Sequence, residues 1–168
     1  MTAKQIHQLF DSQKIDAIIR RMAFQILESN LEEATLYLVG IESQGMVLAD
    51  RIATQLKTMT ASTIELIELN LDKSKPLGSV RTSKNVNQCT DKAVIVIDDV
   101  LNTGSTLIYA VDHFLQVPLK RLQTAVLVNR NHKRFPIKAD VKGVSLSTSY
   151  KEHIEVVFGG NKEGVYLS

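Results

Sequence analysis

Residues 93–106 constrain the fold of this 168-residue chain more than any other segment. The segment begins with apolar, mostly β-branched residues at 93–97, which predict a buried strand. Two adjacent acids, Asp98 and Asp99, come next, and after a short turn the residues Thr-Gly-Ser-Thr at 103–106 open a helical pattern. A buried strand that leads into a helix is typical of a parallel α/β sheet, in which ligands bind beyond the carboxyl ends of the strands. We therefore expect Asp98 and Asp99 to lie at a binding site.

The rest of the chain also alternates between strand and helix patterns. Apolar residues recur at three- and four-residue steps between Ile15 and Leu27, which predicts an amphipathic helix with Asp11 or Ser12 as its N-cap. This alternation favours a parallel sheet with helices on both faces. Further strands are predicted at 36–41, 64–69, 124–128, 144–147, 155–158 and 165–167, and further helices at 45–57 and 104–115.

The composition is that of an ordinary globular protein. A length of 168 residues, with 44% hydrophobic and 23% charged residues, predicts a single domain, residues 1–168, with a sizeable core. The formal net charge of +2 is too small to indicate a nucleic-acid partner. One cysteine, Cys89, excludes a disulfide within the chain. Residues 1–13 lack the apolar core of a signal peptide, and no apolar run is long enough to span a bilayer, so we expect a cytoplasmic protein without a membrane partner.

Residues 70–91 are polar and show no clear periodicity. The segment contains Pro76 and Gly78, which disfavour a continuous helix or strand. A loop of this length in a compact domain is usually a mobile lid or an excursion hairpin, and both interpretations stay open here.

The chemistry of residues 98–106 suits a sugar phosphate. A helix N-terminus offers unpaired backbone N–H groups and a partial positive charge, and the hydroxyls and the glycine of residues 103–106 would complete a cradle for a phosphate monoester. The carboxylates of Asp98 and Asp99 would repel phosphate, but they can accept hydrogen bonds from vicinal ribose hydroxyls or hold Mg²⁺ through water. A diol beside a phosphate indicates a ribose 5-phosphate.

A plainer interpretation is a strand-to-helix turn in which the two acids are solvated and Thr103 caps the helix. Turns attract Asp, so this interpretation suits either acid taken alone, whereas the whole string is more specific than a turn requires. A phosphate loop of the Walker type is disfavoured because the chain has no Gly-Lys-Ser/Thr sequence, and a dinucleotide fingerprint is also absent.

Residues 93–106 are similar to the phosphoribosyl diphosphate (PRPP) signature of type I phosphoribosyltransferases. The similarity continues at 38–45 and 48–53, which resemble the diphosphate-loop region of that superfamily. Residues 125–140 (Ala-Val-Leu-Val-Asn-Arg-Asn-His-Lys-Arg-Phe-Pro-Ile-Lys-Ala-Asp) and 143–152 resemble one branch, the bifunctional pyrimidine operon attenuator/uracil phosphoribosyltransferases. The resemblance covers about residues 15–158 and is weakest at 70–91.

The resemblance implies an α/β fold of the type I phosphoribosyltransferase kind, with a central, mostly parallel sheet flanked by helices. It also implies a flexible lid at about 70–91 and a small hood made of about 143–168 with the N-terminal segment. The implied reaction is displacement of diphosphate from C1 of PRPP by a nucleobase, with Mg²⁺ as cofactor. Uracil is the expected base, UMP the product or effector, and a homodimer or higher homo-oligomer the expected assembly.

The resemblance also implies roles for individual residues. Asp98 and Asp99 are expected to bind the ribose hydroxyls and to orient Mg²⁺ through water. Catalytic cations are expected from the lid, which would close over the site and exclude water. The lid cations are Arg81, Lys84, Lys73 and Lys75. The expected PRPP-binding residues are Ser43, Gln44, Gly45, Asp98, Asp99, Leu101, Asn102, Thr103, Gly104, Ser105 and Thr106, and the expected hood residues over the base are Leu146, Ser147 and Thr148.

Several positions depart from the branch pattern. Gln44 stands where the branch carries a basic residue, which weakens support for the leaving diphosphate, and Ser105 stands where arginine is common. Asn102 replaces the aspartate of purine-using relatives, and an amide cannot act as a general base, so a pyrimidine is favoured. The lid lacks the Tyr-Arg-Asp-Asp pattern of the branch. Two alternatives therefore stay open: a UMP- or PRPP-sensing, RNA-binding regulator of pyrimidine genes with weak or no catalysis, and a phosphoribosyltransferase for another base.

RNA binding is the second activity that the resemblance implies. Without the resemblance, the basic residues around Arg130 and Arg134 indicate only a solvated charged surface. Phe24 and Val144 differ from the branch, and the sequence has no aromatic-rich platform for unpaired bases. Histidines 7, 113 and 153 lack partners at metal-ligand spacing, so no zinc site is expected. The residues that fall near the RNA face of the family are Arg20, Arg21, His132, Lys133 and Lys138.

Overall fold

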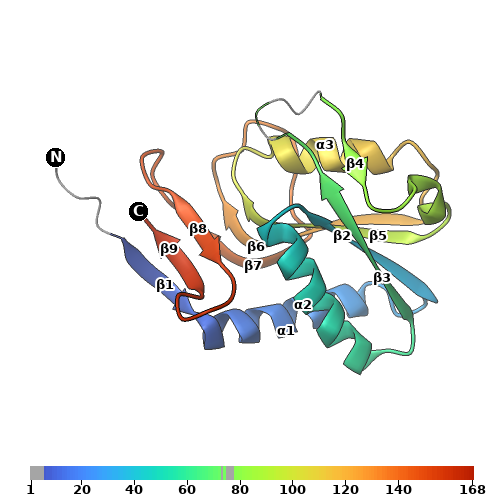
Figure 1. Ribbon diagram of the computed structural model, residues 1–168, viewed down its shortest axis with the longest axis horizontal. Coiled ribbons are helices and arrows are strands. Elements are labelled where there is room, and N and C mark those ends of the chain that lie inside the picture. Colours follow the sequence, from blue (N-terminus) through green and yellow to red (C-terminus); the bar gives the residue numbers. More distant parts are fainter. Residues whose placement is uncertain (1–5, 73, 75–77) are drawn as a thin grey trace.

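The computed structural model describes residues 6–72, 74 and 78–168. These residues form a six-stranded sheet and a three-stranded sheet, with helices on both faces of the larger one (Figure 1). The helices are α1 (Ser12–Glu28), α2 (Gln44–Met59) and α3 (Ser105–Phe114), with a 3-10 helix η1 (Val86–Cys89). The large sheet has the order β4 (Arg81–Thr82), β3 (Thr63–Asn70), β2 (Thr35–Ile41), β5 (Ala93–Leu101), β6 (Arg121–Arg130) and β7 (Val141–Leu146). The small sheet has the order β1 (His7–Asp11), β9 (Gly164–Leu167) and β8 (Ile154–Val157).

The large sheet is parallel except at one edge, which confirms the predicted fold class. Strands β3, β2, β5, β6 and β7 pair in parallel, and only the short β4 runs antiparallel, against β3. Strand β5 lies between β2 and β6; its pairing with β2 ends at Ile97, whereas its pairing with β6 continues through Asp98 to Leu101. Both faces are covered, because α1 and α2 lie on one face of the sheet and α3 on the other (Figure 1).

The alternation of side chains along β5 explains why its apolar run is continuous. Ile95 and Ile97 join the core under α1 and α2, whereas Val94 and Val96 join the core under α3. A parallel strand buried on both faces needs apolar residues at every position. The apolar run predicts that the strand ends at residue 97. The strand instead continues to Leu101, because β5 and β6 pair up to that residue.

The start of α1 follows the predicted cap. The side chain of Asp11 accepts a hydrogen bond from the backbone N–H of Lys14, with an N–O distance of 2.9 Å, so Asp11 is the N-cap. The strand just before it, β1, lacks a sequence signal, because four of its five residues are exposed. It pairs antiparallel with β9 and thereby joins the N-terminal segment to the C-terminal strands.

The hood boundary differs from the span inferred from the sequence. Residues 143–146, which the sequence assigns to the hood, belong to β7 at the edge of the large sheet. Gly143 packs so closely on β6 that an added Cβ would lie 2.3 Å from the carbonyl oxygen of Leu127. The three-stranded sheet therefore draws on residues 7–11, 154–157 and 164–167.

Part of segment 70–91 folds back on the large sheet as a hairpin. Asn70 of β3 pairs with Arg81 of β4, and η1 follows with Cys89 fully buried. Burial raises the pKa of the Cys89 thiol to about 11, which makes it a poor nucleophile. Lys73 and Lys75 lie outside the described residues. Within the part of the chain that is described, no helix has the length and apolar character needed to cross a membrane.

Candidate active site

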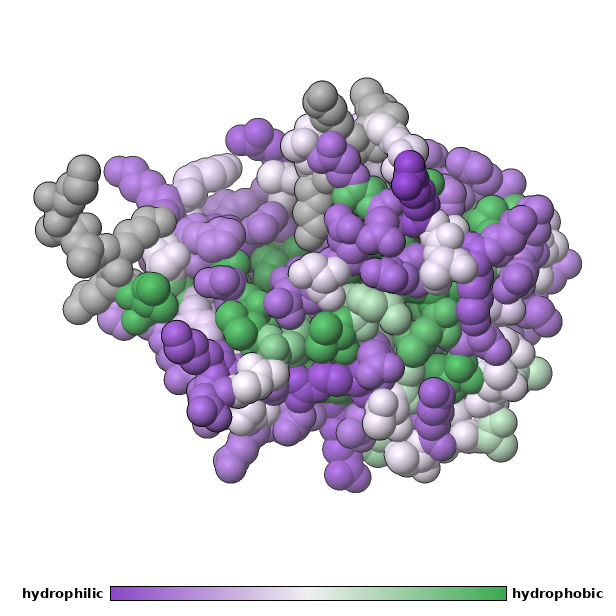
Figure 2. All heavy atoms as spheres, in the orientation of Figure 1, coloured by the Kyte–Doolittle hydropathy of each residue, from purple (hydrophilic) through white to green (hydrophobic). Residues whose placement is uncertain are grey.

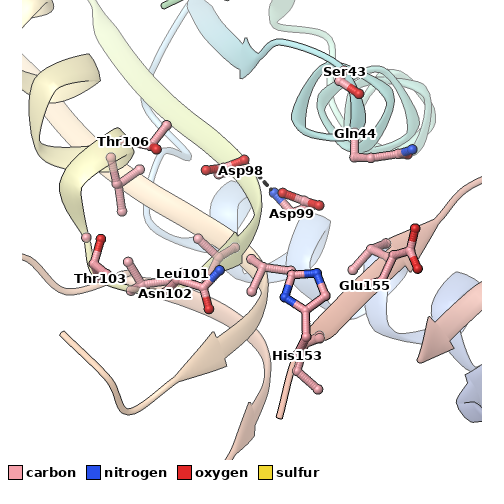
Figure 3. A pocket seen from close by; sticks show the side chains of 16 residues that line it. Ser43, Gln44, Asp98, Asp99, Leu101, Asn102, Thr103, Thr106, His153 and Glu155 are labelled. Atoms are coloured by element: carbon pink, nitrogen blue, oxygen red, sulfur yellow. Dashed lines mark hydrogen bonds between the residues drawn. The ribbon is translucent and has the colours of Figure 1, made fainter. Parts of the chain in front are cut away.

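A cavity of about 410 Å³ opens at the carboxyl end of β5 and extends to the small sheet (Figure 3). The starts of α2 and α3 lie on two sides of it, Asp98 and Asp99 lie between them, and β8 closes the far side. Its lining residues are Ser43, Gln44, Asp98, Asp99, Val100, Leu101, Asn102, Thr103, Gly104, Thr106, Leu107, Val126, His153, Ile154, Glu155 and Val156.

The two adjacent carboxylates have different surroundings. The Asp98 side chain is almost buried, and its Oδ1 accepts a hydrogen bond from the backbone N–H of Asp99 at 2.9 Å. Asp99 is less buried. The backbone contact orients the Asp98 carboxylate, and Asp99 lies between it and the small sheet in Figure 3.

The start of α3 is shaped by Gly104. Its φ of 86° is left-handed, a conformation that side-chain-bearing residues rarely adopt, and an added Cβ would lie 2.7 Å from Cγ2 of Ile137. No side chain caps this helix at Gly104, although the Thr103 hydroxyl accepts from the N–H of Ser105 at 3.3 Å. Ser105 is not on the cavity lining, whereas Thr103 and Thr106 are. The first N–H groups of α3 therefore lie beside the cavity, and as at any helix start they have no acceptor within the helix.

The segment after β6 fixes the other side of this loop. The carbonyl oxygen of Thr103 accepts hydrogen bonds from the N–H groups of Arg134 and Phe135, at 2.8 and 3.1 Å. These two bonds tie residues that are about thirty positions apart in sequence. They turn the Thr103 carbonyl toward the 134–135 backbone.

The start of α2 is strained and closely packed. Ser43, which precedes it, has a φ of 67° and makes no side-chain cap. An added Cβ at Gly45 would lie 3.0 Å from the carbonyl oxygen of Ile97 and 3.3 Å from Oδ1 of Asp98, so glycine lets the helix approach β5. The side-chain oxygen of Gln44 is buried beside the cavity and has no hydrogen-bond partner among the described residues.

Four consecutive residues of the small-sheet region, 153–156, line the wall opposite α3. Ile154 and Val156 are buried and apolar, and His153 and Glu155 alternate with them. Sequence reasoning missed this wall and favoured Leu146, Ser147 and Thr148, none of which is on the described lining. The apolar residues on either side of Glu155 were the available signal, and they predict the strand at 155–158, but nothing local places that strand over the cavity.

The sequence suggests that Arg130 is a solvated surface charge, but its side chain is buried and hydrogen-bonded to several segments. It is 7% exposed and lies at the end of β6. Its guanidinium donates four hydrogen bonds: to Oδ1 of Asn102 at 2.7 Å, to the Thr148 hydroxyl at 2.9 Å, and to two carbonyl oxygens, Ser149 at 3.3 Å and Glu152 at 2.8 Å. Arg130 thus joins Asn102, which precedes the predicted phosphate cradle at 103–106, to residues 148–152, which we call the strap.

The strap is also held by its own contacts. The Glu152 carboxylate accepts the N–H of Ser149, and this hydrogen bond lowers the pKa of Glu152 below its ordinary value. The backbones of His153 and Ser168 exchange two hydrogen bonds, at 2.8 and 3.0 Å, which tie the end of the strap to the C-terminus.

Arg81 and Lys84, the two lid cations within the described residues, do not line the cavity. Lys84 forms an ion pair with Glu65 on β3, and Arg81 is exposed on β4. Neither is among the described lining residues, so the described walls carry Asp98, Asp99 and Glu155 without a lysine or arginine.

The residues expected on an RNA face are spread over two regions. Arg20 lies over the ring of Phe24, at 5.9 Å from its centre, and Arg21 donates to the carbonyl oxygens of Lys142 and Gly143. Lys133 and Lys138 are exposed after β6. His132 packs against Tyr150 with ring centres 4.6 Å apart, and Tyr150 is 85% exposed. The sequence gives no sign of this aromatic pair, because its members are eighteen residues apart.

The donor set of the cavity suits a hard cation held partly by a ligand. No group of three or more His, Cys, Asp or Glu residues that could hold a metal occurs among the described residues. Asp98 and Asp99 nevertheless offer carboxylate oxygens toward the cavity. Mg²⁺ usually keeps several waters and binds through one or two carboxylates together with phosphate oxygens, so the residues present fit Mg²⁺.

Comparison with known proteins agrees with this geometry. The family model described as phosphoribosyl transferase domain matches residues 5–159. The bifunctional protein PyrR of Ligilactobacillus salivarius is 33% identical, over 95% of this chain and 97% of that protein. The bifunctional protein PyrR of Latilactobacillus sakei is 34% identical, over 90% of each.

Solved structures show the same fold at lower identity. A hypoxanthine-guanine phosphoribosyltransferase from Bacillus anthracis superposes with a TM-score of 0.72 at 20% identity, covering 85% of this chain and 84% of that one. A hypoxanthine phosphoribosyltransferase from Trypanosoma cruzi gives 0.76 at 15% identity, covering 94% and 92%. Fold, matched domain and relatives agree: the chain belongs to the phosphoribosyl transferase domain family and is a pentosyltransferase related to the bifunctional PyrR proteins.

Proposed function

We propose that the protein transfers ribose 5-phosphate from PRPP to uracil, which gives UMP and diphosphate. The observation that carries the proposal is the placement of two helix starts on either side of two carboxylates in one cavity. PRPP has anionic groups at both ends and a diol between them. A site with a positive pole at each end and acceptors in the middle complements that charge pattern.

The site divides the substrate among its elements. The N–H groups at the start of α3, with the hydroxyls of Thr103 and Thr106, bind the 5-phosphate. The strained backbone at Ser43 and the first N–H groups of α2 bind the diphosphate. Asp98 and Asp99 accept hydrogen bonds from the ribose hydroxyls. This assignment gives the two helix starts anionic partners and the two carboxylates hydroxyl partners.

Mg²⁺ is the cofactor of the proposed reaction, and Asp98 and Asp99 would hold it, chiefly through water. When bound, the ion supplies positive charge to the diphosphate and ribose oxygens. This supply matters because the described walls hold three carboxylates and no lysine or arginine.

The reaction breaks the bond from C1 to the diphosphate oxygen and forms a bond from C1 to N1 of uracil, whose proton is released. The ribose becomes cationic during this exchange, and the carboxylates of Asp98 and Asp99 stabilise it electrostatically. The chain otherwise contributes position: the two helix starts hold the sugar phosphate, and β8 holds the base near C1. Ile154 and Val156 give the base an apolar surface.

Diphosphate release tests the proposal. The protein is incubated with PRPP, Mg²⁺ and one base at a time from a panel of uracil, cytosine, hypoxanthine and guanine. We expect turnover with uracil, and a loss of at least about 100-fold in kcat/KM for Asp99→Asn and for Thr106→Ala, because each removes a contact to PRPP. Asp112→Asn, an exposed change on α3, is the matched control. No turnover with uracil would rule out the proposed base, and full PRPP affinity in both site variants would rule out the site.

We infer a second candidate function, binding of RNA, from the His132–Tyr150 pair. Tyr150 is exposed, and a hollow of about 260 Å³ beside it is lined by Arg130, His132 and Arg134 together with Asn102 and Thr103. An exposed ring next to cations can stack on an unpaired base while the cations meet phosphate. The curated relatives are named bifunctional, which also supports a second activity.

Salt dependence separates the two functions. We expect a pyrimidine-leader RNA to bind more tightly in the presence of UMP, with an affinity that falls as salt rises, and Tyr150→Ala to weaken binding by about 10-fold. Turnover of uracil by Tyr150→Ala is measured in parallel. If RNA affinity is the same with and without the Tyr150 ring, the aromatic pair is not an RNA platform. UMP binding without turnover would favour a regulator over an enzyme.

A further inference from the structure

We propose that Arg130 fixes the amide of Asn102 so that Asn102 presents only hydrogen-bond donors to the base, and that Asn102 thereby selects a base with an acceptor on the facing edge. The inference deepens the proposed function and rests on it for the location of the base. It adds a positioning residue, Arg130, and a specificity-determining residue, Asn102.

The first step is the orientation of the amide. An amide side chain has one oxygen that accepts and one nitrogen that donates, and the two ends are close in size. Arg130 carries only donors, and its Nη1 lies 2.7 Å from the Asn102 oxygen. The reverse orientation would place the amide N–H groups against guanidinium N–H groups. The oxygen is therefore held toward Arg130.

The second step is the rigidity of the arginine. Three further hydrogen bonds, to the Thr148 hydroxyl and to the carbonyl oxygens of Ser149 and Glu152, use its remaining nitrogens. Because the side chain is 7% exposed, little water competes for these contacts. The guanidinium cannot turn away from Asn102 without breaking bonds to the strap.

The third step is what Asn102 offers to a ligand. Asn102 lines the main cavity, and in Figure 3 its amide nitrogen points toward the side on which Asp99 lies, with its oxygen directed away. The amide N–H₂ group thus remains for the ligand. It matches a carbonyl oxygen or a deprotonated ring nitrogen of a pyrimidine. A protonated purine nitrogen would set donor against donor, and a buried unpaired donor is costly.

The test is a double-mutant cycle on kcat/KM for uracil, with PRPP kinetics measured in parallel. Asn102→Leu and Asn102→Asp both remove the donors at nearly constant size. We expect each to lower kcat/KM for uracil by about 10- to 100-fold, chiefly through the KM for uracil. Full activity of Asn102→Asp with uracil would overturn the donor assignment.

Arg130→Lys keeps the charge but loses the fixed fork. In the wild-type background it should also cost about 10-fold for uracil; in the Asn102→Leu background it should cost less than about 2-fold, because its effect passes through Asn102. Equal losses in both backgrounds would mean that Arg130 only supports the strap, and the proposal would fail. Lys151→Met, an exposed change in the strap, is the control.

The cycle is repeated on UMP affinity by calorimetry, so that it does not depend on turnover. Absence of diphosphate release with uracil, together with a coupled loss of UMP affinity in the Asn102 and Arg130 variants, would overturn the proposed transfer reaction and support the orientation of Asn102. Diphosphate release with uracil, together with independent losses of UMP affinity in the Asn102 and Arg130 variants, would support the transfer reaction and overturn the proposed orientation of Asn102.

Discussion

At the residue scale, the conformation of Gly104 shapes the start of α3 beside the candidate site. The left-handed φ of 86° turns the chain from Thr103 into α3, and an added Cβ would meet Ile137 at 2.7 Å. We expect Gly104→Ala to lower the free energy of unfolding by about 2–4 kcal/mol, because left-handed strain and overpacking add. It should also weaken PRPP binding at least about 10-fold by moving the first N–H groups of α3. Urea unfolding and calorimetric titration with PRPP and Mg²⁺ measure the two effects.

Gly159 supplies the matched control. Its φ of 81° is equally left-handed, but an added Cβ there would have no atom within 4 Å. Gly159→Ala should therefore cost only the backbone strain, about 1–2 kcal/mol, and leave PRPP affinity unchanged. An equal decrease in the free energy of unfolding for both variants would show that the contact with Ile137 does not add to the destabilisation.

The placement of residues 98–104 and 106 beside one cavity was predictable from the sequence, and the burial of Arg130 was not. Residues 98–106 form a continuous string between a buried strand and a helix, which predicts that they lie together at the carboxyl end of the strand. The partners of Arg130 lie at 102, 148, 149 and 152, so its burial arises only when β6 pairs with both β5 and β7. An arginine at a strand end is exposed in most proteins, and local sequence holds no sign of the exception.

At the element scale, α2 connects the site to the small sheet. Its first turn lines the cavity, and Arg51 further along pairs with Glu163, at 2.9 Å, and with Asp16. The Arg51 guanidinium also lies 5.3 Å from the centre of the Phe158 ring. These contacts hold the β8–β9 connection against α2, and so they fix the position of β8 relative to the cavity.

Glu163 makes that attachment dependent on pH. Burial alone would raise the pKa of Glu163, but the N–H of Gly159 and the Arg51 guanidinium outweigh it and lower the pKa below its ordinary value of 4.5. Stabilisation from such a group is present above the unfolded pKa and is lost as pH falls through the folded one. We expect Glu163→Gln to destabilise the protein by about 1 kcal/mol at pH 7.

Urea unfolding across pH 3 to 8 checks this expectation. The difference between Glu163→Gln and wild type should shrink below about pH 4.5 and vanish once the wild-type carboxyl is protonated. Glu28→Gln, an exposed change at the end of α1, is the control. A constant difference at every pH would mean that the effect is one of packing rather than of charge.

Two strands differ from what the apolar pattern predicts, because strand pairing rather than the pattern sets where these strands begin and end. The predicted strand at 93–97 extends to Leu101, because β6 is long enough to pair with Asp98 and with Val100. Strand β1 escaped prediction since it is exposed on most of its length and owes its conformation to β9. Partners distant in sequence decided both cases, and a single sequence carries little information about them.

At the scale of the whole molecule, the two sheets meet around an acidic cavity. Polar side chains dominate the outline in Figure 2, and apolar ones are exposed chiefly toward the middle of that face. The described walls of the cavity combine Asp98, Asp99 and Glu155 with two helix starts. In the proposed function, an anionic ligand would take its charge balance from bound Mg²⁺ and from the helix poles. A ligand that reaches both sheets would link them.

Hydrogen exchange can detect that linkage. UMP should contact both the α3 start and β8, whereas ribose 5-phosphate lacks a base and should contact only the large-sheet side. At matched saturation we expect UMP to slow exchange in β8 and its partner β9 by at least about 10-fold relative to ribose 5-phosphate, because a bound base must leave before the small sheet opens. Residues at the α3 start should be protected equally by both ligands, which provides an internal control. Equal protection of β8 by the two ligands would mean that the phosphate alone orders the small sheet, and the base would then contribute affinity without joining the sheets.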